Sequence, residues 1–330
     1  MPHSYDYADL LEFAHFSDLS YKNADERVMP AGWFVIDEKV AIGERVTAAV
    51  AKKLGKGAGA GDDSDDNTLR PERHFAAFFN PSQNRLVIAY RGTDFNNTND
   101  VMNDIQIFKE GQPEERVREA LAFTQRVVEK VSTWRFWYQQ SLFSSCHFRK
   151  PKVQLTGHSL GAAVAECVCL RTGYETVTFD SPGLELTAAD NTAYCDQIYS
   201  LLNDPDLVNC CNPHPGNTYH ISAKGEHSAQ KQVAKAGGKL VFRAGASAVA
   251  GYFGLPDMVA DVASTVTKRI ADPLEDTWLK HPLKHFVKAL NARTPIQSVS
   301  QWPDLKDYLT STDPSTLVPT ASASATATAT

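Results

Sequence analysis

The segment Gly157-His158-Ser159-Leu160-Gly161 holds the residues whose types and spacing most directly indicate chemistry. A short apolar run with β-branched side chains precedes it at 153–156, and an alanine-rich stretch follows at 162–170. This order predicts a strand, a tight turn and a buried helix. A serine on such a turn is presented at the carboxyl edge of a sheet, where it can act as a nucleophile. The pentapeptide alone is weak evidence, but its flanking segments favour a catalytic Ser159.

The glycines and the predicted helix have separate roles at this turn. Gly157 and Gly161 keep side chains out of a crowded space, and the helix directs its positive end at a developing oxyanion. The backbone N–H of Leu160, the residue after the nucleophile, is one expected oxyanion donor. A strand, a Gly-x-Ser-x-Gly turn and a helix together predict the nucleophile elbow of an α/β-hydrolase.

A nucleophilic serine needs a histidine base and a carboxylate that orients this histidine. In this fold they follow the serine in the order Asp, then His. Asp206 belongs to the segment 203–208, which comes directly after the predicted strand Ile198–Leu202, at the sheet edge where the acid belongs. Asp204 and Asp180 are its rivals, with the competing interpretations that Asp204 caps the turn before Pro205 and that Asp180 shapes the preceding turn.

The base must come from the histidines that follow the acid. His281 is the first choice, because Pro282 after it suits the first turn of a helix. His285 is the alternative, and it is interpreted as a residue on the face of that helix. The remaining histidines after Asp206 follow it too closely or are weaker candidates: His214, His220 and His227.

Several of these segments resemble the class 3 lipases, the fungal-lipase-like family of α/β-hydrolases. The catalytic Asp of that family lies in a segment Asn-x-x-Asp-Ile/Pro-Val-Pro, which is similar to residues 203–209 and aligns its Asp with Asp206. Asn209 stands in place of the usual Pro. The family segment Thr-Phe-Gly-x-Pro is similar to residues 178–182, with Asp180 in place of Gly.

Two further segments carry the resemblance. Residues 86–94 look like the family's strand followed by Arg-Gly-Thr, which implies that Thr93 donates the second N–H to the oxyanion. His281, with Leu283 and Phe286 after it, resembles the family's catalytic histidine. The resemblance implies a serine ester hydrolase that acts on acylglycerols or phospholipids through an acyl-enzyme, as a lipase or phospholipase A1, without metal or cofactor.

The hydrophobic pattern predicts elements that alternate between strand and helix. Such an order indicates a mostly parallel sheet with helices on both faces. Helices are expected at 7–19 and 114–137, and strands at 34–36, 75–79, 86–90, 177–179 and 198–202, with 75–79 and 86–90 forming a hairpin.

Residues 1–309 are expected to form one α/β-hydrolase domain, and residues 310–330 a disordered low-complexity tail. The domain includes a flexible Gly/Asp-rich loop at 55–67. It also includes an Ala/Gly-rich, cap-like insertion at 231–270, which is either a packed helical pair or a mobile cap that opens on lipid. The packed interpretation is slightly favoured, because small side chains suit close helix contact.

Composition narrows the class of protein. The 330 residues are 42% hydrophobic and 22% charged with a net charge of −6, which suits a globular domain and disfavours a nucleic-acid partner. No Sec signal or apolar run long enough to span a bilayer is visible, and the six cysteines are interpreted as reduced thiols. We expect a cytoplasmic or peripheral membrane protein, with specialised secretion left open, that meets a lipid ester at a membrane or droplet surface. The oligomeric state leaves no trace in the sequence.

Two other functions compete with this interpretation. A hydrolase-fold protein can bind a lipid or a partner without turnover, and a thioesterase or peptidase can use the same fold. A fluorophosphonate probe, which labels only an activated serine, separates the first from an enzyme. Hydrolysis of long-chain esters, but not of acyl-CoA or peptides, separates the second.

Overall fold

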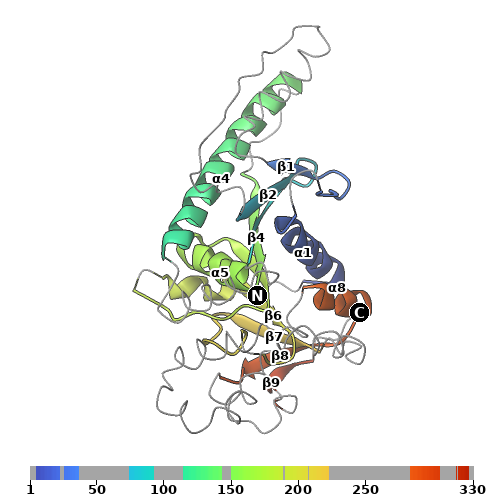
Figure 1. Ribbon diagram of the computed structural model, residues 1–330. Helices are drawn as coiled ribbons and strands as arrows, with labels where there is room; N and C mark the ends of the chain where they lie inside the picture. The colour runs from blue at the N-terminus through green and yellow to red at the C-terminus, as the bar shows by residue number, and fades with distance from the viewer. Residues whose placement is uncertain are drawn as a thin grey trace, which may run out of the picture.

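The computed structural model describes residues 5–22, 26–36, 74–92, 114–142, 150–188, 190–206, 208–222, 283–304, 317 and 319–326. Within these residues nine strands form one sheet, in which each strand pairs with the next along the chain (Figure 1). They are β1 (Phe34–Ile36), β2 (Phe75–Asn80), β3 (Arg85–Tyr90), β4 (Lys152–His158), β5 (Glu175–Phe179), β6 (Ile198–Leu202), β7 (Asn217–Ile221), β8 (Ile296–Gln301) and β9 (Thr320–Thr326). Strands β3 to β7 run parallel, and antiparallel pairs extend both edges. The fold is the mostly parallel sheet with antiparallel edges, as the sequence predicts for its centre.

Helices cover both faces of the sheet (Figure 1). On one face lie α1 (Tyr7–Ser20) and α8 (Lys284–Asn291), and on the other α4 (Glu114–Leu142) and α5 (Leu160–Thr172). Helix α4 connects β3 to β4 and α5 connects β4 to β5, as parallel neighbours require. The 3₁₀ helix η2 (Thr192–Gln197) leads into β6.

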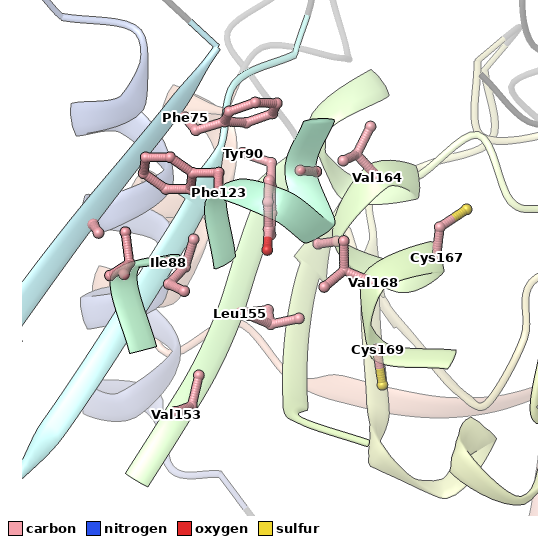
Figure 2. Packing of buried hydrophobic residues seen from close by; sticks show 14 of the residues in the cluster. Phe75, Ile88, Tyr90, Phe123, Val153, Leu155, Val164, Cys167, Val168 and Cys169 are labelled. Carbon is pink, nitrogen blue, oxygen red and sulfur yellow. The ribbon is translucent and has the colours of Figure 1, made fainter. Parts of the chain in front are cut away.

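The two helical layers explain why the central strands are apolar without alternation. In β3, Leu86 and Ile88 belong to the core beneath α4 and α5, whereas Val87 and Ala89 belong to the core beneath α1. A strand with both faces covered reads as a continuous apolar run. Figure 2 shows the first core, in which Phe123 of α4 and Val164 of α5 lie around Tyr90 at the end of β3.

Strand register sets the position of the candidate site. Because β3 to β6 are parallel, their carboxyl ends meet at one edge of the sheet. His158 lies opposite Phe179, and Phe179 lies opposite Leu201. The residues that follow these strands, including Ser159 and Asp180, therefore line the same edge.

The expected elements are confirmed, with shifts of a few residues at their ends. The first helix ends at Ser20 instead of Leu19, and the long helix continues to Leu142. The hairpin is present, with Phe75 opposite Tyr90. The expected loop at 55–67 and the insertion at 231–270 lie outside the described residues.

One expectation differs from the structure. Thr320–Thr326, inside the segment expected to be disordered, forms β9 and pairs with β8. Threonine stands at both ends of this stretch, where its β-branched side chain suits an extended chain, and alanine alternates with serine between them. Low complexity is therefore compatible here with pairing to an open sheet edge.

Two composition-based expectations concern the membrane and the cysteines. No helix within the described residues is long and apolar enough to cross a bilayer. Within the described residues the cysteines at 167, 169, 195, 210 and 211 form no disulfide, whereas Cys146 lies outside these residues.

Candidate active site

Ser159 occupies the sharp turn between β4 and α5. Its backbone has φ 58° and ψ −130°, a conformation that residues other than glycine rarely adopt. The turn is held on both sides, because the N–H of Ser159 donates to the carbonyl of Phe179 at 3.0 Å and its carbonyl accepts from Ala162 at 2.9 Å. Ser159 therefore lies on a strained strand-to-helix turn, the geometry that a nucleophile elbow requires.

Glycines on both sides of Ser159 are required by close backbone contacts. A Cβ atom on Gly157 would overlap the carbonyl of Gly161, and one on Gly161 would overlap the carbonyl of Tyr90 at the end of β3. Both positions therefore exclude every side chain, as the sequence predicts for a crowded turn. The close approach of Gly161 to Tyr90 also places the first turn of α5 in contact with the end of β3.

The end of β3 lies against the same turn. A Cβ atom on Gly92 would overlap the carbonyl of His158 and come within 3.2 Å of the Cβ of Ser159. The Tyr21 hydroxyl joins these segments, since it accepts from the N–H of Gly92 at 3.2 Å and lies 3.0 Å from Nδ1 of His158. Thr93, the expected second oxyanion donor, lies outside the described residues. Sequence reasoning did not identify Tyr21, because nothing in the local pattern links α1 to the turn.

Asp206 is fully buried in the loop that follows β6. Its Oδ1 accepts the N–H groups of Val208 and Asn209, both at 2.8 Å, and its own N–H donates to Oδ1 of Asn209 at 2.8 Å. The carboxylate is therefore held by backbone donors at the edge of the sheet that carries Ser159. Such an arrangement suits an acid that must keep a fixed direction.

The two rival acids have other partners. Asp204 lies 3.1 Å from Nε2 of His220, and the carboxylate also accepts weakly from Ser222 at 3.5 Å. Asp180 is fully buried directly after β5, and its Oδ1 accepts the N–H of Asn203 at 2.8 Å. Its backbone φ is 44°, so it forms a left-handed turn at this edge.

The histidines separate into distinct environments. His281 lies outside the described residues, two positions before Leu283 at the start of α8. His285 is buried within α8, which agrees with its interpretation as a helix-face residue. Burial lowers the pKa of His214 to about 4, so this imidazole is neutral at pH 7 and its Nε2 donates to the carbonyl of Asn209 at 2.8 Å. His220 is paired with Asp204.

A further buried carboxyl lies on helix α5, which follows Ser159. Glu166 of α5 is fully buried and accepts hydrogen bonds from the hydroxyls of Thr178, Ser181 and Ser200, at 2.8, 2.8 and 2.9 Å. Burial raises the pKa of Glu166 to about 7, because the loss of solvent outweighs the three hydroxyl donors, which lower it. Sequence reasoning missed this group, since a single Glu in an alanine-rich helix gives no sign of its partners.

This pKa shift predicts a pH-dependent stability. Between pH 4.5 and about 7 the folded protein holds a proton on Glu166 that the unfolded chain has lost, so the free energy of unfolding falls as the pH rises through this window. Gln in place of Glu166 cannot ionise. We expect the unfolding free energy of the wild type, relative to Glu166→Gln, to be higher at pH 4.5 than at pH 8 by roughly 3 kcal/mol.

Urea denaturation of both proteins at several pH values measures this difference. Both proteins share all other ionisable groups, so the contributions of these groups cancel in the comparison. Glu185→Gln, at an exposed position on the loop after β5, controls for the substitution itself. A difference that stays constant from pH 4.5 to pH 8 would mean that Glu166 titrates as an ordinary exposed carboxyl.

No group of three or more His, Cys, Asp or Glu side chains within the described part of the chain is arranged to hold a metal ion. The polar groups gathered at the sheet edge are instead a serine, carboxylates and amide side chains. What they can do chemically is nucleophilic attack followed by proton transfer, provided that a histidine base is near.

Comparisons with known proteins bear on this chemistry. The family model Lipase (class 3) matches residues 87–173, which extend from β3 past the end of α5 and include Ser159. No curated protein sequence matches the chain significantly. Among solved structures the chain is similar to Lip2 lipase from Yarrowia lipolytica, with 12% identity, a TM-score of 0.36, and coverage of 66% of this chain and 78% of that chain. The family match confirms the predicted resemblance to the class 3 lipases over this segment, and it supports ester hydrolysis of the lipase type as the general activity.

Proposed function

We propose that this chain is a serine ester hydrolase that cleaves the carboxylic esters of acylglycerols or phospholipids through an acyl-enzyme. The observation that carries the proposal is the strained backbone of Ser159 at the turn between β4 and α5, inside the segment 87–173 that matches the class 3 lipases. Strain of this kind is retained where a side chain must be presented for a function.

The mechanism assigns one role to each residue. Oγ of Ser159 attacks the ester carbonyl carbon while its proton passes to His281, and Asp206 orients His281 and stabilises the imidazolium. The N–H groups of Leu160 and Thr93 stabilise the oxyanion. The C–O bond then breaks, and the alcohol leaves with the proton from His281. Water, deprotonated by His281, releases the fatty acid and restores Ser159.

The position of Asp206 supports its role as the acid. It is buried after β6, two strands from the nucleophile, and its backbone hydrogen bonds hold the carboxylate in place. Asp204 is less suited, because its carboxylate already pairs with His220.

The packing of α8 supports His281 as the base. Leu283 and Phe286 belong to the core that includes Phe179, and the rings of Phe286 and Phe179 lie 5.4 Å apart between centroids. The carbonyl of Phe179 accepts the N–H of Ser159. The start of α8, three residues beyond His281, is therefore close to the turn that carries Ser159.

The backbone around Ser159 supports the two oxyanion donors. Leu160 is the first residue of α5, and an N–H in the first turn of a helix has no acceptor within the helix. Gly92, directly before Thr93, lies against Ser159. The Ala/Gly-rich, Lys/Arg-bordered composition of residues 231–270 supports a substrate at a membrane or droplet surface.

The test presents the purified protein with two kinds of substrate. Triacylglycerol emulsions and diacyl phospholipid vesicles are assayed for released fatty acid, with acyl-CoA and peptide substrates alongside. In parallel, a fluorophosphonate probe is applied to native and heat-denatured protein, and the labelled peptide is identified by mass spectrometry. We expect fatty acid release from one of the two lipid classes and labelling of Ser159 in the native protein alone.

Each other outcome has a definite meaning. Labelling of Ser159 with turnover of acyl-CoA alone would make the protein a thioesterase. No labelling and no turnover would exclude a serine hydrolase and favour a binding protein with a hydrolase fold.

A further inference from the structure

The Asn209 side chain lies at the centre of the loop that carries Asp206. It is fully buried and uses both ends of its amide. Its Oδ1 accepts the N–H of Asp206 at 2.8 Å and Nε1 of Trp302 at 3.3 Å, and its Nδ2 donates to the carbonyl of Asp204 at 3.3 Å. A buried amide with every group satisfied has little freedom to rotate, so it can fix the groups around it.

The same Nδ2 also contacts Asp180, the residue that directly follows β5. It donates to Oδ1 of Asp180 at 3.2 Å, and this oxygen also accepts the N–H of Asn203. Asp180 stands where the class 3 pattern has Gly, and Asn209 stands where it has Pro. The two departures from the pattern therefore contact each other. With φ at 44°, Asp180 keeps the left-handed backbone that glycine adopts freely, while adding a carboxylate that glycine lacks.

Asp180 is in turn connected to the nucleophile turn. Its N–H donates to the carbonyl of Leu201 in β6, and the preceding residue, Phe179, accepts the N–H of Ser159. Hydrogen bonds, together with the peptide bond between Phe179 and Asp180, thus connect Ser159 through Asp180 and Asn209 to Asp206. All four of these residues are buried.

We propose that Asn209 is a positioning residue that sets the place of Asp206 relative to Ser159 by joining the Asp206 backbone to the carboxylate of Asp180. This inference rests on the proposed function, in which Asp206 orients the base. It differs from a role in stability alone, because a displaced acid slows the chemical steps and leaves substrate binding intact.

The main variant is Asn209→Asp. It preserves the shape of the side chain and the oxygen that accepts the Asp206 N–H. It replaces the amide that donates to Asp180 with a second buried carboxylate, which repels the carboxylate of Asp180. We expect kcat for ester hydrolysis and the rate of fluorophosphonate labelling to fall about 10²-fold, with KM nearly unchanged. Asn291→Asp in α8 is the matched control, since it also loses an amide donor to a backbone carbonyl, and its kcat should equal that of the wild type.

An exchange variant tests the contact itself. Asp180→Asn combined with Asn209→Asp returns one amide and one carboxylate to the pair, in reversed positions. We expect kcat to recover at least roughly tenfold over Asn209→Asp alone, since one of the two repelling charges is gone. A folded exchange variant with no recovery would overturn the inference.

A second single variant applies if Asn209→Asp does not fold. Asp180→Gly removes the carboxylate and relieves the left-handed backbone, so it should fold. Its kcat should fall roughly tenfold at constant KM, and an unchanged kcat would overturn the inference.

The proposed function fails in a different way. If the wild type neither hydrolyses esters nor labels at Ser159, the function itself is wrong. If Asp180→Gly loses as much activity as Ser159→Ala, then Asp180 is the acid, and the assignment of Asp206 falls together with this inference.

Discussion

Ser159→Ala is expected to lower kcat for ester hydrolysis by on the order of 10⁶-fold. The remaining rate is the one that the oxyanion donors and substrate binding support without a nucleophile. The reason is that the acyl-enzyme cannot form without Oγ, so the two-step route is closed. Substrate binding does not depend on Oγ, and KM for any residual turnover should change little. Labelling by a fluorophosphonate should disappear completely.

Folding must be separated from chemistry in this variant. The Ser159 side chain makes no capping hydrogen bond to α5, and alanine meets the same backbone strain at φ 58°. We therefore expect a melting temperature equal to that of the wild type or slightly higher. A folded Ser159→Ala protein with activity within tenfold of the wild type would show that another nucleophile is used, and the elbow would then have only a structural role.

The strand–turn–helix unit could be predicted from sequence because its signals are local. The close contact at Gly157 lies within a few residues, and the apolar runs on either side of the turn are long enough to define a strand and a helix. The same holds for the hairpin of β2 and β3, whose turn residues lie between two buried strands. Parallel neighbours then follow from the alternation of strands and helices.

Contacts between distant segments could not be predicted in this way. The Tyr21 hydroxyl meets His158 across 137 positions of the chain, and Glu166 finds its hydroxyl partners on β5, on β6 and in the loop after β5. From the sequence, Asn209 is only a departure from a family pattern, and its contact with Asp180 gives that departure a physical reason. Strand β9 likewise depends on a contact between distant segments, because it pairs with the open edge of β8, which the sequence of the tail does not reveal.

His281→Ala is expected to have the second large effect, a loss in kcat on the order of 10⁶-fold that matches the loss from Ser159→Ala. Without the imidazole, the Ser159 hydroxyl keeps its proton and is a weak nucleophile at neutral pH. The matched control is His285→Gln, four residues further along the chain. His285 is buried within α8, so this control should lower the melting temperature and leave kcat close to that of the wild type.

The combined variant Ser159→Ala/His281→Ala distinguishes a shared mechanism from two independent losses. Residues that act as one unit give strongly non-additive effects, so the double variant should be no slower than either single variant. A further large loss in the double variant would mean that His281 acts separately from Ser159. If instead His285→Gln removes activity and His281→Ala retains it, the base lies one turn inside α8. Asp206 would then have to orient a histidine held within that helix, and the position of α8 against Phe179 would set the reach of the base toward Ser159.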